Sequence, residues 1–230
     1  MIVANRPSTN DEDYVQARRQ MVEGQLRARG IRDQRVLQAM ATVPREEFVS
    51  PSMRHAAYRD AALPIEFGQT ISQPFTVAFM CEALRLQGTE KVLEIGAGSG
   101  YSAAVLSLLC GEVHTVERIP ELAELARQRL LRLGYENVRV YAANGTLGLP
   151  AAAPFDGIVV TAGAPALPCR YARQLAEGGR IVIPIGPSPT SQEMRRFTRH
   201  GDELEQEELG GFAFVPLIGV EGWEEIPERL

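Results

Sequence analysis

The 230-residue chain carries a formal net charge of −5, so an acidic balance argues against a nucleic-acid partner held through its phosphates. No apolar run approaches the roughly 20 residues of a membrane span, and the start lacks the pattern of a secretory signal, so we expect a cytoplasmic protein with no membrane partner. Cys81, Cys110 and Cys169 are scattered and form no zinc motif, so no metal site is expected.

The N-terminal part of the chain has helical periodicity. Apolar residues recur at spacings of three and four over residues 11–43, with a break at Gly30 and an N-cap candidate at Asp33. The same spacing predicts a further helix over residues 68–87. We therefore predict a helical extension over residues 1–67.

Beyond this region, short apolar runs alternate with helical stretches. The predicted strands are residues 91–96, 112–117, 138–144, 155–163 and 179–186. The predicted helices are residues 101–110, 120–134 and 172–179. Alternation of this kind indicates an α/β fold with a parallel sheet covered on both faces.

The C-terminal region has a different pattern. Residues 192–219 predict an antiparallel hairpin at the edge of the sheet, with its turn at residues 200–202. We predict a single domain, residues 1–230, in which an α/β core over residues 68–188 is followed by a hairpin and tail over residues 189–230.

A glycine-rich turn, "EIGAGSG", joins the first core strand to its helix. Gly96, Gly98 and Gly100 allow positive φ angles and let a ligand approach the backbone, and the helix start offers unpaired amides. Glu117 ends the next strand, 21 positions after Gly96, where a carboxylate can accept both hydroxyls of a ribose. The pattern predicts a cofactor that contains a nucleoside.

Spacing and charge discriminate between two such cofactors. A dinucleotide turn runs G-x-G-x-x-G, whereas this turn runs G-x-G-x-G. Glu94, two residues before the first glycine, would repel a pyrophosphate but suits a cation such as a sulfonium. S-adenosylmethionine is favoured over NAD, which leaves a nicotinamide oxidoreductase as the less favoured alternative.

The turn resembles the first motif of Rossmann-like S-adenosylmethionine-dependent methyltransferases. In addition, "MVEGQLRARGIRDQRVLQAMATVPREEFV", "YRDAALPIEFGQTISQPFTVAFM", "QLAEGGRIVIPIG" and "FVPLIGVEGW" look closely like the protein-L-isoaspartate O-methyltransferases, over about residues 20–223. The resemblance implies a class I methyltransferase fold, with a mostly parallel doubly wound sheet, and a monomer. It also implies methyl transfer from S-adenosylmethionine to the α-carboxylate of isoaspartyl residues in damaged proteins, with S-adenosylhomocysteine as product.

The implied reaction needs little catalytic apparatus. A carboxylate with a pKa near ~4 is already an anion at neutral pH, so no general base is required, and catalysis is mostly alignment. Isoaspartyl-containing proteins and peptides are the expected partners. Two alternatives stay open: a specialised relative that methylates an ordinary aspartate or a dedicated peptide, and an S-adenosylmethionine-binding protein without turnover.

The resemblance also implies roles for individual residues. Ser72 in "TISQP" matches the active-site serine, whose hydroxyl orients the substrate carboxylate, although it could instead cap the helix that follows. The implied cofactor-binding residues are Gln69, Thr70, Ile71, Glu94, Gly96, Ala97, Gly98, Gly100, Glu117, Arg118, Asn144 and Gly145. The implied substrate-binding residues are Leu63, Pro64, Ile65, Val215 and Leu217, the last two through a backbone that can pair with a peptide.

Two loops depart from the family's pattern. Ala143, Asn144 and Gly145 replace a Gly-Asp-Gly sequence, and we expect the Asn144 amide oxygen to accept a cofactor hydrogen bond without the charge that strengthens it. Glu66 and Phe67 replace part of a glycine-rich turn near the substrate entrance. An added carboxylate there is expected to disfavour acidic peptides.

Overall fold

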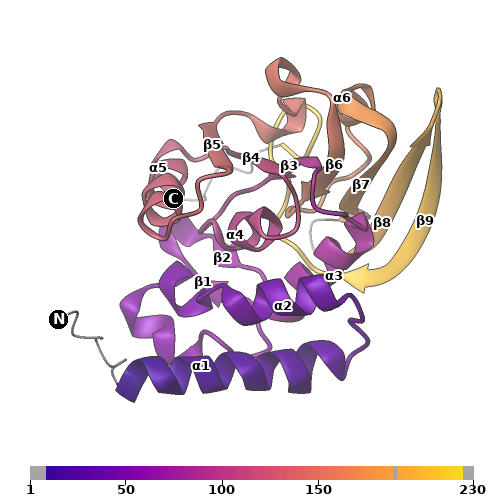
Figure 1. The fold of residues 1–230 in the computed structure, drawn as a ribbon. Coiled ribbons are helices and arrows are strands. Elements are labelled where there is room, and N and C mark those ends of the chain that lie inside the picture. Colours follow the sequence, from indigo (N-terminus) through magenta and orange to yellow (C-terminus); the bar gives the residue numbers. More distant parts are fainter. Residues whose placement is uncertain (1–8, 189–190, 225–230) are drawn as a thin grey trace.

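The computed structural model describes residues 9–188 and 191–224 (Figure 1). The first eight residues of the predicted extension and the last six of the predicted tail lie outside the described residues. The helical segments of the N-terminal region are α1 (Thr9–Met21), the π-helix η1 (Val22–Arg27), α2 (Gln34–Thr42), and the 3-10 helices η2 (Arg45–Phe48) and η3 (Pro51–Ala56). The predicted N-cap is confirmed, because the Asp33 carboxylate accepts from the Arg35 and Val36 amides.

The helix predicted over residues 68–87 is wrong at its start. Two short strands, β1 (Leu63–Pro64) and β2 (Thr70–Ile71), pair antiparallel around the 3-10 turn η4 (Glu66–Gly68). Helix α3 (Pro74–Leu84) begins only at its proline, because a residue that precedes proline is disfavoured in helical conformation. The segment before α3 is therefore an extended loop.

The sheet has seven strands in the order β5-β4-β3-β6-β7-β8-β9 within the described residues. The strands are β3 (Lys91–Ile95), β4 (Glu112–Glu117), β5 (Val138–Ala142), β6 (Phe155–Val160), β7 (Leu175–Ser188), β8 (Ser191–His200) and β9 (Glu203–Phe212). The first five are parallel, and β8 and β9 add an antiparallel hairpin at one edge. The predicted fold class and the position of the hairpin are confirmed.

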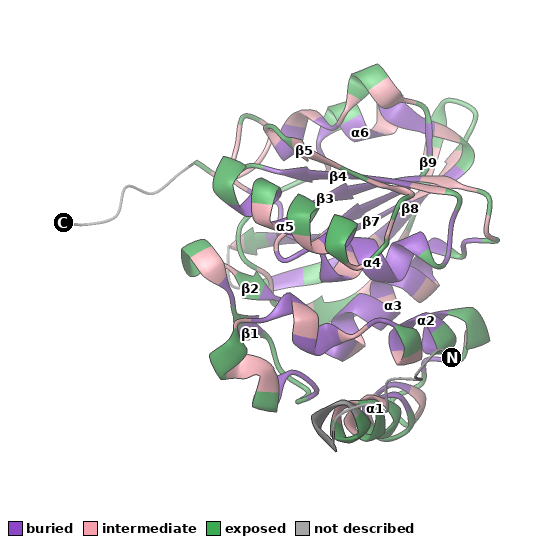
Figure 2. Ribbon diagram, turned by 60° about the vertical axis from the view of Figure 1, so that its left-hand side comes forward, coloured by how far each residue is buried: buried purple, intermediate pink, exposed green. Residues whose placement is uncertain are grey.

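Helices cover both faces of the sheet (Figure 2). Helices α3, α4 (Tyr101–Ser107) and α5 (Pro120–Arg132) pack on one face, α1 and α2 lie outside them, and α6 (Cys169–Gln174) lies on the other face. Val92 and Val113 belong to the apolar cluster on the α4 side, whereas Leu93 and Ile95 belong to the cluster around Tyr171 of α6. Strand alternation therefore divides the core into two layers. Across the described ranges, no helix is long and apolar enough to cross a membrane.

Two predicted elements near the C-terminus are wrong. The helix predicted over residues 172–179 ends at Gln174, because Leu175 pairs in parallel with Phe155 and so begins β7. The returning strand of the hairpin ends at Phe212 and does not reach residue 219. The chain beyond β9 turns back toward the end of β6.

The order of the strands creates a switch point at β3. From β3 the chain moves outward through β4 to β5, and it then returns to the other side of β3 as β6. In open α/β sheets, ligands bind beyond the carboxyl ends of the strands at such a point.

Candidate functional site

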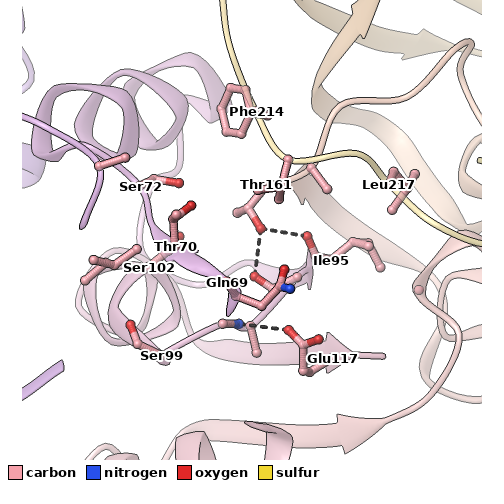
Figure 3. Close-up of a pocket in the computed structure, with 18 of the residues that line it drawn as sticks. Gln69, Thr70, Ser72, Ile95, Ser99, Ser102, Glu117, Thr161, Phe214 and Leu217 are labelled. Carbon is pink, nitrogen blue, oxygen red and sulfur yellow. Dashed lines mark hydrogen bonds between the residues drawn. The ribbon is translucent and has the colours of Figure 1, made fainter. Parts of the chain in front are cut away.

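A cavity of about 170 Å³ lies beyond the carboxyl ends of β3, β4 and β6 (Figure 3). A site for one water molecule needs only about 10–15 Å³, so the space is of ligand size. Its walls come from the β2 segment, the glycine turn, the end of β4, the loop after β6 and residues 213–218. The cavity therefore occupies the switch point.

Each of the three glycines of the turn has a positive φ angle. Gly96, Gly98 and Gly100 have φ angles of 96°, 52° and 90°. A Cβ on Gly96 would overlap the Thr161 hydroxyl, which lies 2.7 Å from the Gly96 carbonyl oxygen and 3.0 Å from that of Ile95. Glycine is required at position 96 by its conformation and by this close approach.

Glu117 ends β4 and holds the turn against it. Its carboxylate accepts from the Gly98 amide at 3.0 Å and from the Ile119 amide at 3.1 Å, and the side chain lines the cavity. A carboxylate has about four acceptor sites, so both oxygens can still accept hydroxyl donors. The position fits the predicted ribose-binding acid.

Glu94 lies beneath the turn and does not itself line the cavity. Its side chain is fully buried, Oε2 accepts from the Thr115 hydroxyl at 2.6 Å, and Oε1 has no hydrogen-bond partner in the described structure. Burial raises the pKa of Glu94 to about 7, the Thr115 and Ser102 hydroxyls oppose that rise, and the charge of Glu117 adds to it. Ser102 lines the cavity and so connects the buried carboxylate to it.

Ser72 lines the opposite wall, between β2 and α3 (Figure 3). The N-cap of α3 is Gln73, which makes no side-chain capping bond, so the alternative that Ser72 caps this helix is wrong. The Ser72 hydroxyl makes no hydrogen bond to the described residues, while its carbonyl accepts from Arg45 Nη2 at 2.7 Å. The hydroxyl is therefore available to a ligand in the cavity.

The residues just before Ser72 form two groups: some line the cavity, and others lie behind that lining. Of the predicted cofactor residues here, Gln69, Thr70 and Ile71 line the cavity. Of the predicted substrate residues, Leu63 and Ile65 are buried in the core and Pro64 is exposed, and none of the three lines the cavity. Pairing of β1 with β2 places them behind the wall that they support.

The predicted peptide-pairing backbone is largely engaged within the chain. Val215 and Leu217 line the cavity. However, the Gly163 amide donates to the Val215 carbonyl, and the Leu217 amide donates to the Gly163 carbonyl, each at 2.8 Å. The Leu217 carbonyl accepts from Trp223 at 2.7 Å. These three main-chain groups are therefore not available to pair with a peptide.

The amide oxygen of Asn144 is also engaged. It accepts from the Thr146 amide at 3.1 Å and from the Thr146 hydroxyl at 2.8 Å, which uses both of its lone pairs. Gly145 lines the cavity and Asn144 does not. In this arrangement the oxygen stabilises the turn after β5, and its predicted bond to a cofactor donor stays a prediction.

Glu66 is paired rather than free. Its carboxylate lies 3.3 Å from Arg129 Nη2 of α5, and Arg129 Nη1 donates to the Ser99 carbonyl at 2.7 Å. This contact ties η4 to the glycine turn. The expected repulsion of acidic peptides is reduced, because Arg129 offsets the added charge.

Several cavity residues were missed by the sequence analysis. Two further residues that were predicted to bind the cofactor, Ala97 and Arg118, line the cavity. Gly100 does not line it, and its positive φ angle contributes to the shape of the turn. The missed lining residues include Ser99, Tyr101, Ser102, Thr161 and Phe214. Thr161 directly follows β6, so the rule that ligands bind at carboxyl ends of parallel strands could have identified it.

Comparison with known proteins relates this geometry to a family. The family model for protein-L-isoaspartate(D-aspartate) O-methyltransferase matches residues 16–222. Protein-L-isoaspartate O-methyltransferase 2 of Pelobacter propionicus is 56% identical over 220 residues, which is 95% of this chain and 97% of the relative. A protein-L-isoaspartate O-methyltransferase of Rhodopseudomonas palustris is 54% identical over 206 residues, 89% of this chain and 94% of the relative.

Solved structures give the same result. A protein-L-isoaspartate O-methyltransferase superposes with a TM-score of 0.80 at 32% identity, covering 89% of this chain and 67% of the other. A Plasmodium falciparum structure in complex with S-adenosyl-L-homocysteine has a TM-score of 0.76 at 24% identity, covering 87% of this chain and 98% of the other, and supports the fold alone. The chain belongs to the protein-L-isoaspartate(D-aspartate) O-methyltransferase family.

Proposed function

We propose that this protein transfers a methyl group from S-adenosylmethionine to the α-carboxylate of L-isoaspartyl residues in damaged proteins. One observation carries the proposal: an unengaged Ser72 hydroxyl and a glycine turn backed by Glu117 face the same cavity. The family relationship supplies the reaction, and the cavity supplies a place in which both reactants meet.

The residues present fit the cofactor. Gly96 and Gly98 line the cavity without a side chain, and Glu94 keeps one buried oxygen without a partner in the described structure. Glu117 and the Gly98 segment would hold the nucleoside, while Glu94, through its charge, favours a cationic ligand. When bound, S-adenosylmethionine supplies an electrophilic methyl group on a sulfonium.

The substrate carboxylate needs orientation rather than activation. It is ionised at neutral pH, so it is already nucleophilic and no residue of the chain has to remove a proton from it. The Ser72 hydroxyl donates a hydrogen bond that holds the carboxylate in line with the methyl group. Isoaspartyl-containing proteins and peptides are the proposed partners.

Paired peptides test this function directly. The two members are identical except for isoaspartate or aspartate at one position, and mass spectrometry detects the gain of one methyl group. Methylation of the isoaspartyl member alone supports repair of damaged proteins. Methylation of the aspartyl member would contradict the proposal and favour a specialised relative, and bound cofactor with neither peptide modified would favour a protein without turnover.

The pKa of Glu94 predicts pH-dependent cofactor binding. Since this pKa is about 7, Glu94 ionises as pH rises through neutrality, and its anion favours the cationic cofactor. We expect affinity to rise about tenfold between roughly pH 5.5 and 7.5, with proton release on binding. Because the folded pKa lies above the ordinary 4.5, the free energy of unfolding without ligand should fall over the pH range from 4.5 to about 7.

Titration calorimetry in buffers of different ionisation enthalpy measures both the affinity and the released proton. Glu94→Gln is the matched variant, because it keeps the shape of the side chain and cannot titrate. The S-adenosylmethionine affinity of this variant should no longer rise between about pH 5.5 and 7.5. An unchanged pH profile in Glu94→Gln would assign the titration to another group.

A further inference from the structure

A buried guanidinium lies behind the wall of the cavity. Arg45 of η2 is 0% exposed, donates from Nε to the Ala57 carbonyl at 2.8 Å, and donates from Nη2 to the Ser72 carbonyl at 2.7 Å. Its third nitrogen, Nη1, has no hydrogen-bond partner in the described structure. The proposed orienting serine is therefore held from behind by a charged group.

Arg45 has no carboxylate to neutralise it. No ion pair joins Arg45 to any acid of residues 9–188 and 191–224, and the neighbouring Glu46 carboxylate is paired with Arg18 at 3.0 Å. The guanidinium carbon lies 4.7 Å from the centroid of the Tyr101 ring, and Tyr101 also lines the cavity. Burying a charge without a counter-ion costs free energy of folding. An anion that enters the cavity would offset this cost.

We propose that Arg45 is a positioning residue for methyl transfer: it fixes the Ser72 backbone, and its uncompensated charge attracts the substrate carboxylate into the cavity. The inference rests on the proposed function, because it needs an anionic substrate. The anion that offsets the charge of Arg45 is the isoaspartyl carboxylate itself, so no phosphate or nucleotide is needed for that purpose.

The two actions of Arg45 affect different kinetic constants. The carboxylate is fully charged when it binds and loses its charge as the ester forms, so the Arg45 charge stabilises the bound substrate more than the transition state. Loss of the charge should therefore raise the peptide KM. Loss of the hydrogen bond to Ser72 misaligns the hydroxyl and should lower kcat.

Two substitutions separate these actions. Arg45→Met removes both, and we expect the KM for an isoaspartyl peptide to rise about tenfold and kcat to fall about tenfold, with S-adenosylmethionine affinity unchanged by calorimetry. Arg45→Lys introduces an ammonium group, and burial lowers the pKa of a lysine, so this charge is lost as pH rises. Its peptide KM should be near that of the unsubstituted protein at about pH 6 and approach that of Arg45→Met at about pH 9, as the lysine deprotonates.

The two tyrosines near Arg45, Tyr58 and Tyr101, do not titrate between about pH 6 and 9. Burial raises the pKa of Tyr101 to about 12, and burial also raises the pKa of Tyr58. Glu46, the next residue along the chain, is paired with Arg18. A KM that depends on pH only in Arg45→Lys therefore reports the introduced ammonium.

Arg35→Met is the matched control. Arg35 also donates to two main-chain carbonyls, those of Leu86 at 2.7 Å and Leu109 at 2.8 Å, but none of these three residues lines the cavity. This variant should lose stability while keeping peptide KM and kcat. Suppose that the unsubstituted protein methylates the isoaspartyl peptide and that Arg45→Met has the same peptide KM and kcat as Arg35→Met. The inference about Arg45 is then wrong, and the proposed function survives. Without methylation by the unsubstituted protein, both are wrong.

Discussion

Replacing Gly96 with alanine should weaken S-adenosylmethionine binding by about 100-fold or more. Gly96 has a φ angle of 96°, which disfavours other residues, and the new Cβ would overlap the Thr161 hydroxyl. That hydroxyl holds the carbonyls of Ile95 and Gly96 together, so relief of the overlap must displace the turn. Isothermal titration calorimetry with the cofactor measures the loss.

Gly134→Ala is the control for Gly96→Ala, because it introduces the same backbone strain without a steric overlap. Gly134 has a φ angle of 81°, and a Cβ there would meet nothing within 4 Å. We expect this variant to lose about 1 kcal/mol of stability and to keep its cofactor affinity. Normal binding by Gly96→Ala, or an equal loss in both variants, would show that the close approach of Thr161 does not control the turn.

Replacing Ser72 with alanine should lower kcat for isoaspartyl peptide by about 10- to 100-fold. A hydrogen bond to a charged group contributes about 1.5–3 kcal/mol, and its main role here is to align the carboxylate. Cofactor affinity should stay within about twofold, since the hydroxyl has no partner among the described residues and is proposed to contact substrate. Steady-state kinetics with a synthetic isoaspartyl peptide give kcat and KM separately.

Ser107→Ala is the comparison for Ser72→Ala. Ser107 is also a serine with a defined environment, because its hydroxyl donates to the Ala104 carbonyl at 2.7 Å within α4, and it does not line the cavity. Its peptide kinetics should not change. If Ser72→Ala retained full activity, the carboxylate would have to be oriented by other groups, such as the main chain of the loop.

Much of the architecture was predictable because it depends on local patterns. Alternating apolar strands and helices specify a parallel sheet covered on both faces, whatever the details of packing. The glycine turn and Glu117 also follow from local chemistry: a backbone at positive φ needs glycine, and the next parallel strand must end beside it. Asp33 as an N-cap is a similar case, since its partners are two and three residues away.

Element boundaries were less predictable where distant pairing decides them. Residues 172–179 have helical composition, yet Leu175 joins the sheet because Phe155 offers a parallel partner. Likewise, the segment after Phe212 leaves the hairpin because Gly163 binds Val215 and Leu217. In both cases the partners come from segments that the local pattern does not contain.

Three features follow from the amino-acid sequence alone: the class of fold, the glycine turn after β3 and, through family resemblance, the choice of Ser72 as the candidate active-site serine. The contacts that support those residues depend on the packed structure. The contact of Arg45 with Ser72 spans 27 positions and that of Arg129 with Glu66 spans 63, so neither leaves a periodic signal in the chain. Buried polar groups are paired by whichever carbonyls and carboxylates the fold brings within hydrogen-bond distance, and that proximity exists only after the layers have packed.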